Sequence, residues 1–361
     1  MEADLLVVGA SFAGLACARS AALRGLRVVL LEKKASAGER LHTTGLIVKD
    51  AVDSIPWLHE VPPALVRRID GVRLYSPDMR HVDLHAPGYW FWATDTPRLI
   101  DWMLASAVDA GVDARLATPF NEARRVSGGW EVTAGGETLR ARYLVGADGP
   151  QSRVARSLGL SANRQFLFGV EHEYAGATMA ANLLHCFIDR RLAPGYIGWA
   201  FQGVRAAQVG LARRVVAGEQ PKPDIAALLE KARGRVDPSG APIDVRAGMI
   251  PCGGLLPHVA CPGALLVGDA AGMVSPVTAG GIHTALRHGS HAGEAVSDHI
   301  MKGAVDPASW IVRSYPQFRT KRMLRWLFDR FQRDWIFNRL LGTAAMRRAA
   351  ELIYFHRKGG V

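Results

Sequence analysis

The chain has 361 residues, of which 49% are hydrophobic and 21% charged, so it is an ordered globular protein rather than a disordered or fibrous one. Its length suits two domains, or one large domain with an inserted sheet. The formal net charge is +11, but residues 310–361 alone hold twelve Lys and Arg against three acids. The remainder is nearly neutral, which excludes a broad nucleic-acid surface and confines any anionic partner to the C-terminal segment.

Cysteine spacing and hydropathy predict a reducing, aqueous compartment. The four cysteines form no C-x-x-C pair and have no histidine at metal-ligand spacing, so we expect reduced thiols. Residues 1–4 are acidic and lead directly into a strand, unlike a signal peptide. No apolar run approaches the roughly eighteen residues of a membrane-spanning helix. We therefore expect a cytoplasmic protein.

The first motif is a glycine-rich turn between a strand and a helix. An apolar strand over residues 5–8 ends at Gly9, a helical pattern covers 15–23, and a second strand over 27–31 ends at Glu32. In dinucleotide-binding folds the pyrophosphate lies at such a helix N-terminus, and an acid about 20 residues after the glycines binds ribose hydroxyls. Ser11 replaces the usual middle glycine. The predicted nucleotide contacts are Gly9, Ser11, Phe12, Ala13, Gly14, Glu32 and Lys33.

Residues 38–101 contain a loop, a hairpin and the start of a helix. The polar, turn-rich stretch 38–45 is a predicted loop that carries Arg40 and Thr44. Alternating residues on both sides of the turn Ser-Pro-Asp predict a hairpin over 72–85, followed by the aromatic run 89–92. A helix is expected to begin near Pro97. Arg98 then lies in its first turn, where a cation is unfavourable unless an anion is nearby.

Two later segments repeat the strand, glycine and acid arrangement. The strand 141–146 leads to Asp148 and Gly149, and the strand 264–267 leads to Gly268 and Asp269. After the second acid the chain continues through Pro276 to a helix that begins at Gly280, Gly281 and Ile282. A carboxylate at a strand end, next to glycines that open a helix, suits a polyol and a ring held against backbone N–H groups.

Residues 166–211 are strand-like, and 225–232 form a helix within a peripheral excursion. Glu171, His172, Glu173, His185 and Asp189 are metal-ligand types, but strand alternation splits them between two faces, so we predict no metal site.

Three glycine-acid sites in this order resemble the FAD-dependent oxidoreductases of the p-hydroxybenzoate hydroxylase superfamily. The matching residues are Gly9-x-Ser11-x-x-Gly14 with Glu32, Gly146-Ala-Asp148-Gly149, and Gly268-Asp269-Ala-Ala with Pro276. Arg98 matches the FAD-contacting arginine of that superfamily. Tyr196-x-Gly198-Trp199-x-Phe201 and Pro276-Val-Thr-Ala-Gly280-Gly281-Ile282 resemble the geranylgeranyl reductase family. The chain departs from that family by an extra residue between Tyr196 and Trp199, by the lost Pro-Lys after Phe201, and by His42-Thr43-Thr44 where relatives often carry a cysteine and two glycines.

The resemblance implies an α/β fold with a Rossmann-like FAD-binding domain, an inserted antiparallel β-sheet substrate domain and a C-terminal helical segment. The corresponding ranges are 1–70, 96–165 and 248–302 for the FAD-binding domain, and 71–95 and 166–247 for the substrate domain. Residues 303–361 form the basic helical segment.

The resemblance also implies non-covalent FAD, with NAD(P)H or another reductant bound only transiently. The implied FAD contacts are the seven residues given above together with Arg40, Thr44, Arg98, Asp148, Gly149, Gly268, Asp269, Pro276, Gly280, Gly281 and Ile282. The implied substrate pocket is Tyr196, Trp199, Phe201, Trp90 and Trp92, although the group Tyr196, Trp199 and Phe201 also suits a hydrophobic core. We assign no catalytic residue; His42 and His283 are candidate acids, but for each the pattern favours a structural or solvent-bound histidine.

The resemblance points to an FAD-dependent oxidoreductase that acts on a hydrophobic small molecule. Reduction of a carbon–carbon double bond, as in prenyl reductases, is the first expectation. An aromatic or polyketide-type monooxygenase that uses NAD(P)H and O2 is the second, and a non-catalytic flavin-binding redox sensor is the third. The G-W-x-W-x-I-P segment of flavin halogenases is absent from the sequence.

The basic tail contains an apolar stripe. Leu324, Leu327, Phe328, Phe331 and Trp335 have the spacing of one helical face, while Arg325 and Arg333 fall away from it. A basic amphipathic helix of this kind suits the anionic inner surface of a membrane, to which the protein would bind peripherally. Alternatively, the stripe packs on the flavin domain and caps the substrate cavity. The oligomeric state stays open.

Overall fold

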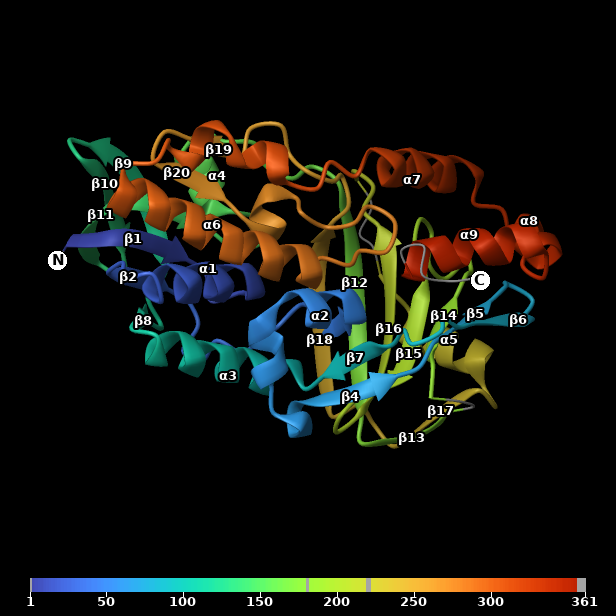
Figure 1. Cartoon of the computed structure of the whole chain (residues 1–361). Coiled ribbons are helices and arrows are strands. Elements are labelled where there is room, and N and C mark those ends of the chain that lie inside the picture. Colours follow the sequence, from blue (N-terminus) through green and yellow to red (C-terminus); the bar gives the residue numbers. More distant parts are fainter. Residues whose placement is uncertain (1, 180–181, 219–221, 356–361) are drawn as a thin grey trace.

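The computed structural model describes residues 2–179, 182–218 and 222–355. Two large sheets lie side by side along the long axis of the molecule, and the C-terminal helices cover the end of the second sheet (Figure 1). The expected α/β architecture, with an inserted sheet and a helical C-terminus, is confirmed.

The first sheet is the Rossmann-like one, and four of its strands carry the motifs. Its order is β19-β20-β11-β1-β2-β8, and β20, β11, β1, β2 and β8 run parallel. Buried Leu, Val and Ile fill both faces, as in parallel sheets covered by helices. The strands are β1 Glu2–Val8, β2 Val28–Leu31, β8 Asp113–Arg115, β11 Glu137–Gly146, β19 Ala260–Cys261 and β20 Ala264–Leu266, extended by β9 Phe120–Val126 and β10 Gly129–Ala134.

Helices α1 (Phe12–Ala22) and α6 (Ile282–Lys302) pack closely on this sheet, with α3 (Thr96–Asp109) beside α1 (Figure 1). The close contact between α1 and α6 requires glycine at position 289, because a Cβ there would lie 2.3 Å from the carbonyl oxygen of Ala13. Two shorter helices, α2 (Lys49–Ser54) and α4 (Arg153–Ser157), complete this half of the molecule.

The second sheet forms the wall opposite the nucleotide half. Its order is β18-β12-β16-β15-β14-β5-β6. It is antiparallel except for β5 and β14, which pair in parallel because β5 enters the sheet from the first domain. The strands are β5 Val72–Tyr75, β6 His81–Leu84, β12 Phe166–Tyr174, β14 Leu184–Phe187, β15 Gly198–Gln202, β16 Ala207–Arg214 and β18 Asp244–Pro251, and α5 (Ile225–Ala232) packs on β16.

Two small sheets complete the fold. β7 (Phe91–Thr94) pairs with β3 (Leu46–Val48) and β4 (Val66–Ile69), and β13 (Gly176–Met179) pairs with β17 (Val236–Ser239). One strand, β18, crosses a predicted domain limit because it continues beyond residue 247. β7 lies within the predicted range of the substrate domain but pairs with strands of the FAD-binding domain.

The C-terminal segment consists of three separate helices rather than one amphipathic helix. They are α7 (Arg319–Phe331), α8 (Asp334–Leu340) and α9 (Ala344–Phe355). The stripe is interrupted at Gln332 because its side chain is buried against the turn after β14, where it accepts a hydrogen bond from the Gly195 N–H at 2.7 Å. Arg325, expected on the polar face, is 5% exposed and ion-paired with Asp329. Within the described part of the chain, no helix has both the length and the hydrophobicity needed to cross a bilayer.

Candidate active site

The motif acids lie at one edge of the Rossmann-like sheet. β20, β11, β1 and β2 are neighbours and parallel, so their carboxyl ends meet at the same edge. Glu32 follows β2, Asp148 follows β11 and Asp269 follows β20, while Gly9 follows β1. Ligands of open α/β sheets bind outside the carboxyl ends of the strands. Three motifs that are far apart in the sequence therefore line one site.

The first turn is built for close backbone approach. A Cβ on Gly14 would lie 1.9 Å from the Gly9 carbonyl oxygen, and a Cβ on Gly9 would lie 2.5 Å from the Ala147 carbonyl oxygen. The Ser11 hydroxyl accepts a hydrogen bond from the Gly14 N–H at 3.2 Å and donates one to the Ala147 carbonyl at 3.0 Å. Ser11 therefore caps α1 and ties its N-terminus to β11, a role that the sequence pattern did not indicate.

Glu32 is fixed by the backbone around it. It is 6% exposed, and its carboxylate accepts hydrogen bonds from the Ala10 N–H at 2.9 Å and the Lys34 N–H at 3.0 Å. These bonds hold the carboxylate beside the N-terminus of α1, where remaining lone pairs can accept ribose hydroxyls.

The Asp148 carboxylate stabilises the turn that leads into α4. It accepts hydrogen bonds from the Ser152 hydroxyl at 2.6 Å and from the N–H groups of Arg153 and Val154 at 2.7 and 3.1 Å. Ser152 caps α4, where its hydroxyl accepts a hydrogen bond from the Ala155 N–H. Asn163, which no sequence pattern indicated, joins this loop to the third motif. Its side-chain amide donates hydrogen bonds to the carbonyls of Pro150 and Asp269 at 3.0 and 2.9 Å.

Asp269 is the acid that stays available to a ligand. Its side chain is half-buried, and within the described residues nothing donates a hydrogen bond to its carboxylate. Burial raises the pKa of this carboxyl to about 6. α6 begins beside it, at Ile282 after Gly281. The site thus combines an unsatisfied carboxylate with the N–H groups of a helix N-terminus.

A single cavity of about 1100 Å³ joins the motif residues to the second sheet and the C-terminal helices. All residues predicted to contact FAD line it except Gly14, Arg98 and Pro276. Gly14 acts through packing. Arg98 lies in the first turn of α3 with its side chain 57% exposed, 3.8 Å from the Asp95 carboxylate, and its contact with FAD stays a prediction.

The other end of the cavity is apolar. Tyr196 and Trp199 line it as expected, and the Tyr196 hydroxyl donates to the Thr278 carbonyl at 2.6 Å, which ties this wall to the loop before α6. Phe201, Trp90 and Trp92 do not line it. Phe201 is fully buried in the sheet core, while Trp90 and Trp92 pack on each other and on the first domain, with their ring centroids 5.4 Å apart. Further lining residues, which no sequence pattern indicated, include Leu74, Cys186, Ile188, Met249, Ile250, Met346, Ile353 and Tyr354.

The two histidine candidates are separated by the fold. His42 lines the cavity from the loop before β3, whereas His283 on α6 does not. Among the described residues, no cluster of His, Cys, Asp and Glu could hold a metal ion.

FAD fits the residues present. The glycine cradle at α1 leaves room for a pyrophosphate, Glu32 is held in place for a ribose, and Asp269 offers an unsatisfied carboxylate for the ribityl hydroxyls. Once bound, FAD would supply two-electron redox chemistry, and the chain would orient it and exclude water.

Comparisons with known proteins agree with this site. A family model described as an FAD binding domain matches residues 67–247, and one described as an NAD(P)-binding Rossmann-like domain matches residues 7–70. Digeranylgeranylglycerophospholipid reductase 2 from Methanopyrus kandleri is 31% identical over 324 residues, which cover 83% of this chain and 78% of the relative. The enzyme of the same name from Methanosphaera stadtmanae is 30% identical over 319 residues, covering 84% of this chain and 80% of the relative.

Solved structures share the fold at lower identity. A geranylgeranyl bacteriochlorophyll reductase-like protein from Thermoplasma acidophilum has a TM-score of 0.82 and 20% identity, covering 99% of this chain and 97% of that chain. A probable FAD-dependent monooxygenase from Pseudomonas aeruginosa has a TM-score of 0.71 and 19% identity, covering 94% and 99%. With FAD-site geometry and curated relatives in agreement, the chain belongs to the geranylgeranyl reductase family of FAD-dependent oxidoreductases.

Proposed function

We propose that this oxidoreductase reduces carbon–carbon double bonds in a long prenyl chain, with FAD bound at the three motif acids. The observation that carries the proposal is the continuity of the cavity. The same space is lined by Glu32 and Asp269 at one end and by Phe328 and Tyr354 at the other. A flat polar cofactor and an extended apolar chain can therefore meet inside one enclosure. The prenyl lipid class comes from the names of the curated relatives.

The test uses the enzyme reduced with dithionite under anaerobic conditions and then mixed with digeranylgeranylglycerophospholipid. We expect the lipid to reoxidise the flavin. Ala349 on α9 is both exposed and part of the cavity lining, so it lies where the cavity opens. Ala349→Trp should slow reoxidation at least about tenfold without loss of FAD. Ala345→Trp, on the same helix but outside the lining, is the matched control. Equal rates in the two variants would contradict the proposed substrate path.

We further propose that the cavity opens toward a membrane surface. Leu324, Leu327 and Phe331 of α7 are 37%, 38% and 53% exposed and also line the cavity. Trp326 and Trp335, at 61% and 63% exposure, extend the same apolar surface onto α8. Exposed arginines lie on these helices, at Arg322, Arg330, Arg333 and Arg339. Aromatic residues beside basic ones favour the headgroup region of an anionic bilayer, from which a prenyl lipid could enter.

Co-sedimentation with phosphatidylglycerol-containing vesicles tests the membrane proposal. Replacing Arg322, Arg330 and Arg333 by glutamine should weaken binding at low salt about 100-fold, because each cation near an anionic leaflet contributes about 1 kcal/mol. Arg325 is left intact because it is buried and ion-paired with Asp329 of the same helix. Three exposed arginines away from this surface, Arg140, Arg142 and Arg233, provide the charge-matched control. Absence of wild-type binding at low salt would refute the proposal.

A further inference from the structure

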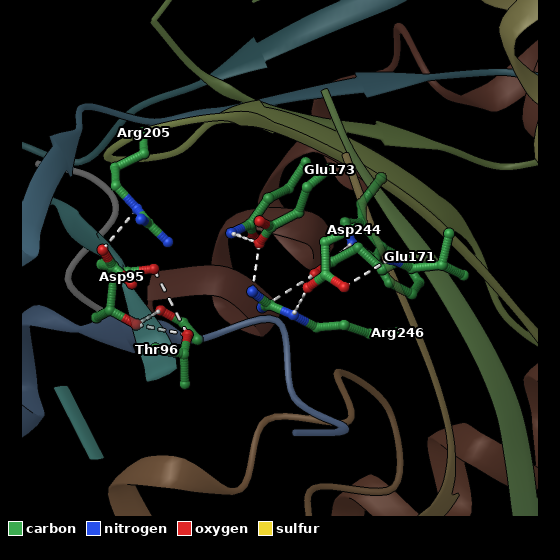
Figure 2. A network of polar contacts seen from close by, with 12 residues as sticks. Asp95, Thr96, Glu171, Glu173, Arg205, Asp244 and Arg246 are labelled. Atoms are coloured by element: carbon green, nitrogen blue, oxygen red, sulfur yellow. Dashed lines mark hydrogen bonds and ion pairs between the residues drawn. The ribbon is translucent and has the colours of Figure 1, made fainter. Parts of the chain in front are cut away.

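Behind Trp199 lies a buried cluster of charged side chains that the FAD site does not use. Arg246 on β18 lies between Glu171 and Glu173 of β12 and Asp244 of its own strand (Figure 2). The strand register places Arg246 opposite Glu171 and Asp244 opposite Glu173. The side chains of Glu171, Glu173 and Arg246 are 5%, 10% and 8% exposed, whereas Asp244 is 53% exposed.

The buried charges do not cancel if both glutamates are ionised. Two buried carboxyl groups face one buried guanidinium, and an uncompensated buried charge is costly. Two carboxyl groups that share such a site titrate so that one of them keeps its proton. Burial raises the pKa of both Glu171 and Glu173. At Glu171 the Trp199 N–H, Arg246 and Thr44 oppose the rise, and at Glu173 Arg246 opposes it.

The contacts assign the proton to Glu171. Glu173 has the closer contacts, because its carboxylate forms the ion pair with Nη2 of Arg246 and accepts from the Gln208 amide at 3.2 Å. Glu171 Oε2 accepts from the Trp199 indole N–H at 2.7 Å, which a neutral carboxylic acid can also do. Glu171 Oε1 is 3.8 Å from Nη1 of Arg246, and neither atom has a hydrogen-bond partner among the described residues.

Glu171 and Arg246 also line a second, small cavity of about 20 Å³. Its other lining residues are His42, Thr43, Thr44, Gly169, Val170, Trp199, Ala247, Gly248 and Ile250, and His42, Thr44 and Trp199 also line the large cavity. A space of this size is large enough for one water beside the polar groups of Glu171 and Arg246. The small cavity therefore adjoins the substrate space through the wall formed by Trp199 and the loop 42–44.

We propose that Glu171 is a proton-storing residue for the reduction and that a water in the small cavity passes its proton to His42, which faces the substrate space. This inference rests on the proposed function. Each reduction breaks the π bond of one alkene and forms two C–H bonds. A hydride arrives from reduced FAD, and His42 donates the proton to the other carbon. Glu171 returns a proton to His42 through the water and is then reprotonated from solvent, while NAD(P)H or another two-electron donor restores the flavin.

Infrared spectroscopy tests proton storage without any substrate. The spectrum is recorded at pH 8, because Asp269, with a pKa of about 6, is ionised there and does not contribute. The FAD-loaded enzyme should show the carbonyl band of a buried carboxylic acid, and this band should shift in D2O. Glu171→Gln should remove this band, and Asp244→Asn, on the exposed side of the same arginine, should keep it because ionised Glu173 still neutralises Arg246. A band that is missing from the wild type, or that survives in Glu171→Gln, would overturn the assignment.

Proton delivery is tested by the rate at which digeranylgeranylglycerophospholipid reoxidises the dithionite-reduced enzyme. Glu171→Gln keeps the acceptor for Trp199 and should slow this step about 100-fold, within the range of general acid catalysis. Its FAD content and its rate of reduction by dithionite should match the wild type, and Asp244→Asn should stay within about threefold. A Glu171→Gln rate near the wild-type rate would refute delivery. If the lipid fails to reoxidise even the wild type, the proposed function fails, while the infrared band still decides proton storage.

Discussion

Replacing Gly14 by alanine should yield a colourless protein. A Cβ at this position would lie 1.9 Å from the Gly9 carbonyl oxygen and 3.1 Å from Cβ of Ala147, so α1 must move away from β1. Overpacking against backbone costs about 3 kcal/mol. If displacement of the α1 N-terminus takes this free energy from FAD binding, the Kd for FAD rises roughly 100-fold. The flavin absorbance of the purified protein and its Tm measure both effects.

Gly342→Ala is the control for this change. An added Cβ there meets no atom within 4 Å, and the backbone conformation is one that L residues adopt. We expect normal FAD content and a Tm close to the wild-type value. Full FAD occupancy in Gly14→Ala would show that α1 and β1 are not packed as described.

Replacing Asp269 by asparagine should weaken FAD binding and yet stabilise the FAD-free protein. The lost bonds are to a charged acceptor, worth about 1.5 to 3 kcal/mol, so the Kd for FAD should rise about 10- to 100-fold. In the FAD-free protein the half-buried carboxylate is a cost, because burial raises its pKa from 3.8 to about 6. Each pKa unit corresponds to about 1.4 kcal/mol, so the gain is of the order of 2 to 3 kcal/mol at neutral pH.

The pH dependence gives the sign of this effect. A raised pKa means that the folded state binds the proton more tightly, so the contribution of Asp269 to wild-type stability falls as pH rises from about 4 to about 6 and is constant above. The FAD-free wild type and Asp269→Asn should therefore have equal free energies of unfolding near pH 4 and differ most above pH 6. Urea unfolding at both pH values measures this. Parallel curves for the two proteins would contradict an unsatisfied Asp269 carboxylate.

The nucleotide half could be predicted from the sequence because its signals are local. Each motif joins a strand, a glycine and an acid within a few residues, and parallel strands bring their carboxyl ends to one edge. Gly9, Glu32 and Asp269 accordingly all line the cavity. The helix 225–232 and the hairpin over 72–85 were likewise set by local periodicity and turn residues.

The substrate half could not be predicted in the same way, because periodicity shows which face is buried but not what it faces. Trp90 and Trp92 follow an aromatic pattern, yet they pack on the first domain, and Tyr354 lines the cavity without any motif. The pairing of Glu171 with Arg246 depends on the register of β12 against β18, which lie far apart in the sequence. Gln332 interrupts the C-terminal stripe because its side chain binds a turn that is distant in the sequence. A hydropathy pattern holds no information on such a contact.

The most direct test of the central claim, that one cavity brings reduced FAD to a prenyl double bond, is the mass of the lipid product. Digeranylgeranylglycerophospholipid is incubated anaerobically with FAD-loaded enzyme and dithionite, and the extracted lipid is weighed by mass spectrometry. We predict a gain of two hydrogens for each double bond reduced, with Ala349→Trp giving less product than Ala345→Trp. An unchanged lipid under these conditions, together with a gain of one oxygen when NADPH and air are supplied, would contradict reduction and identify the enzyme as a monooxygenase.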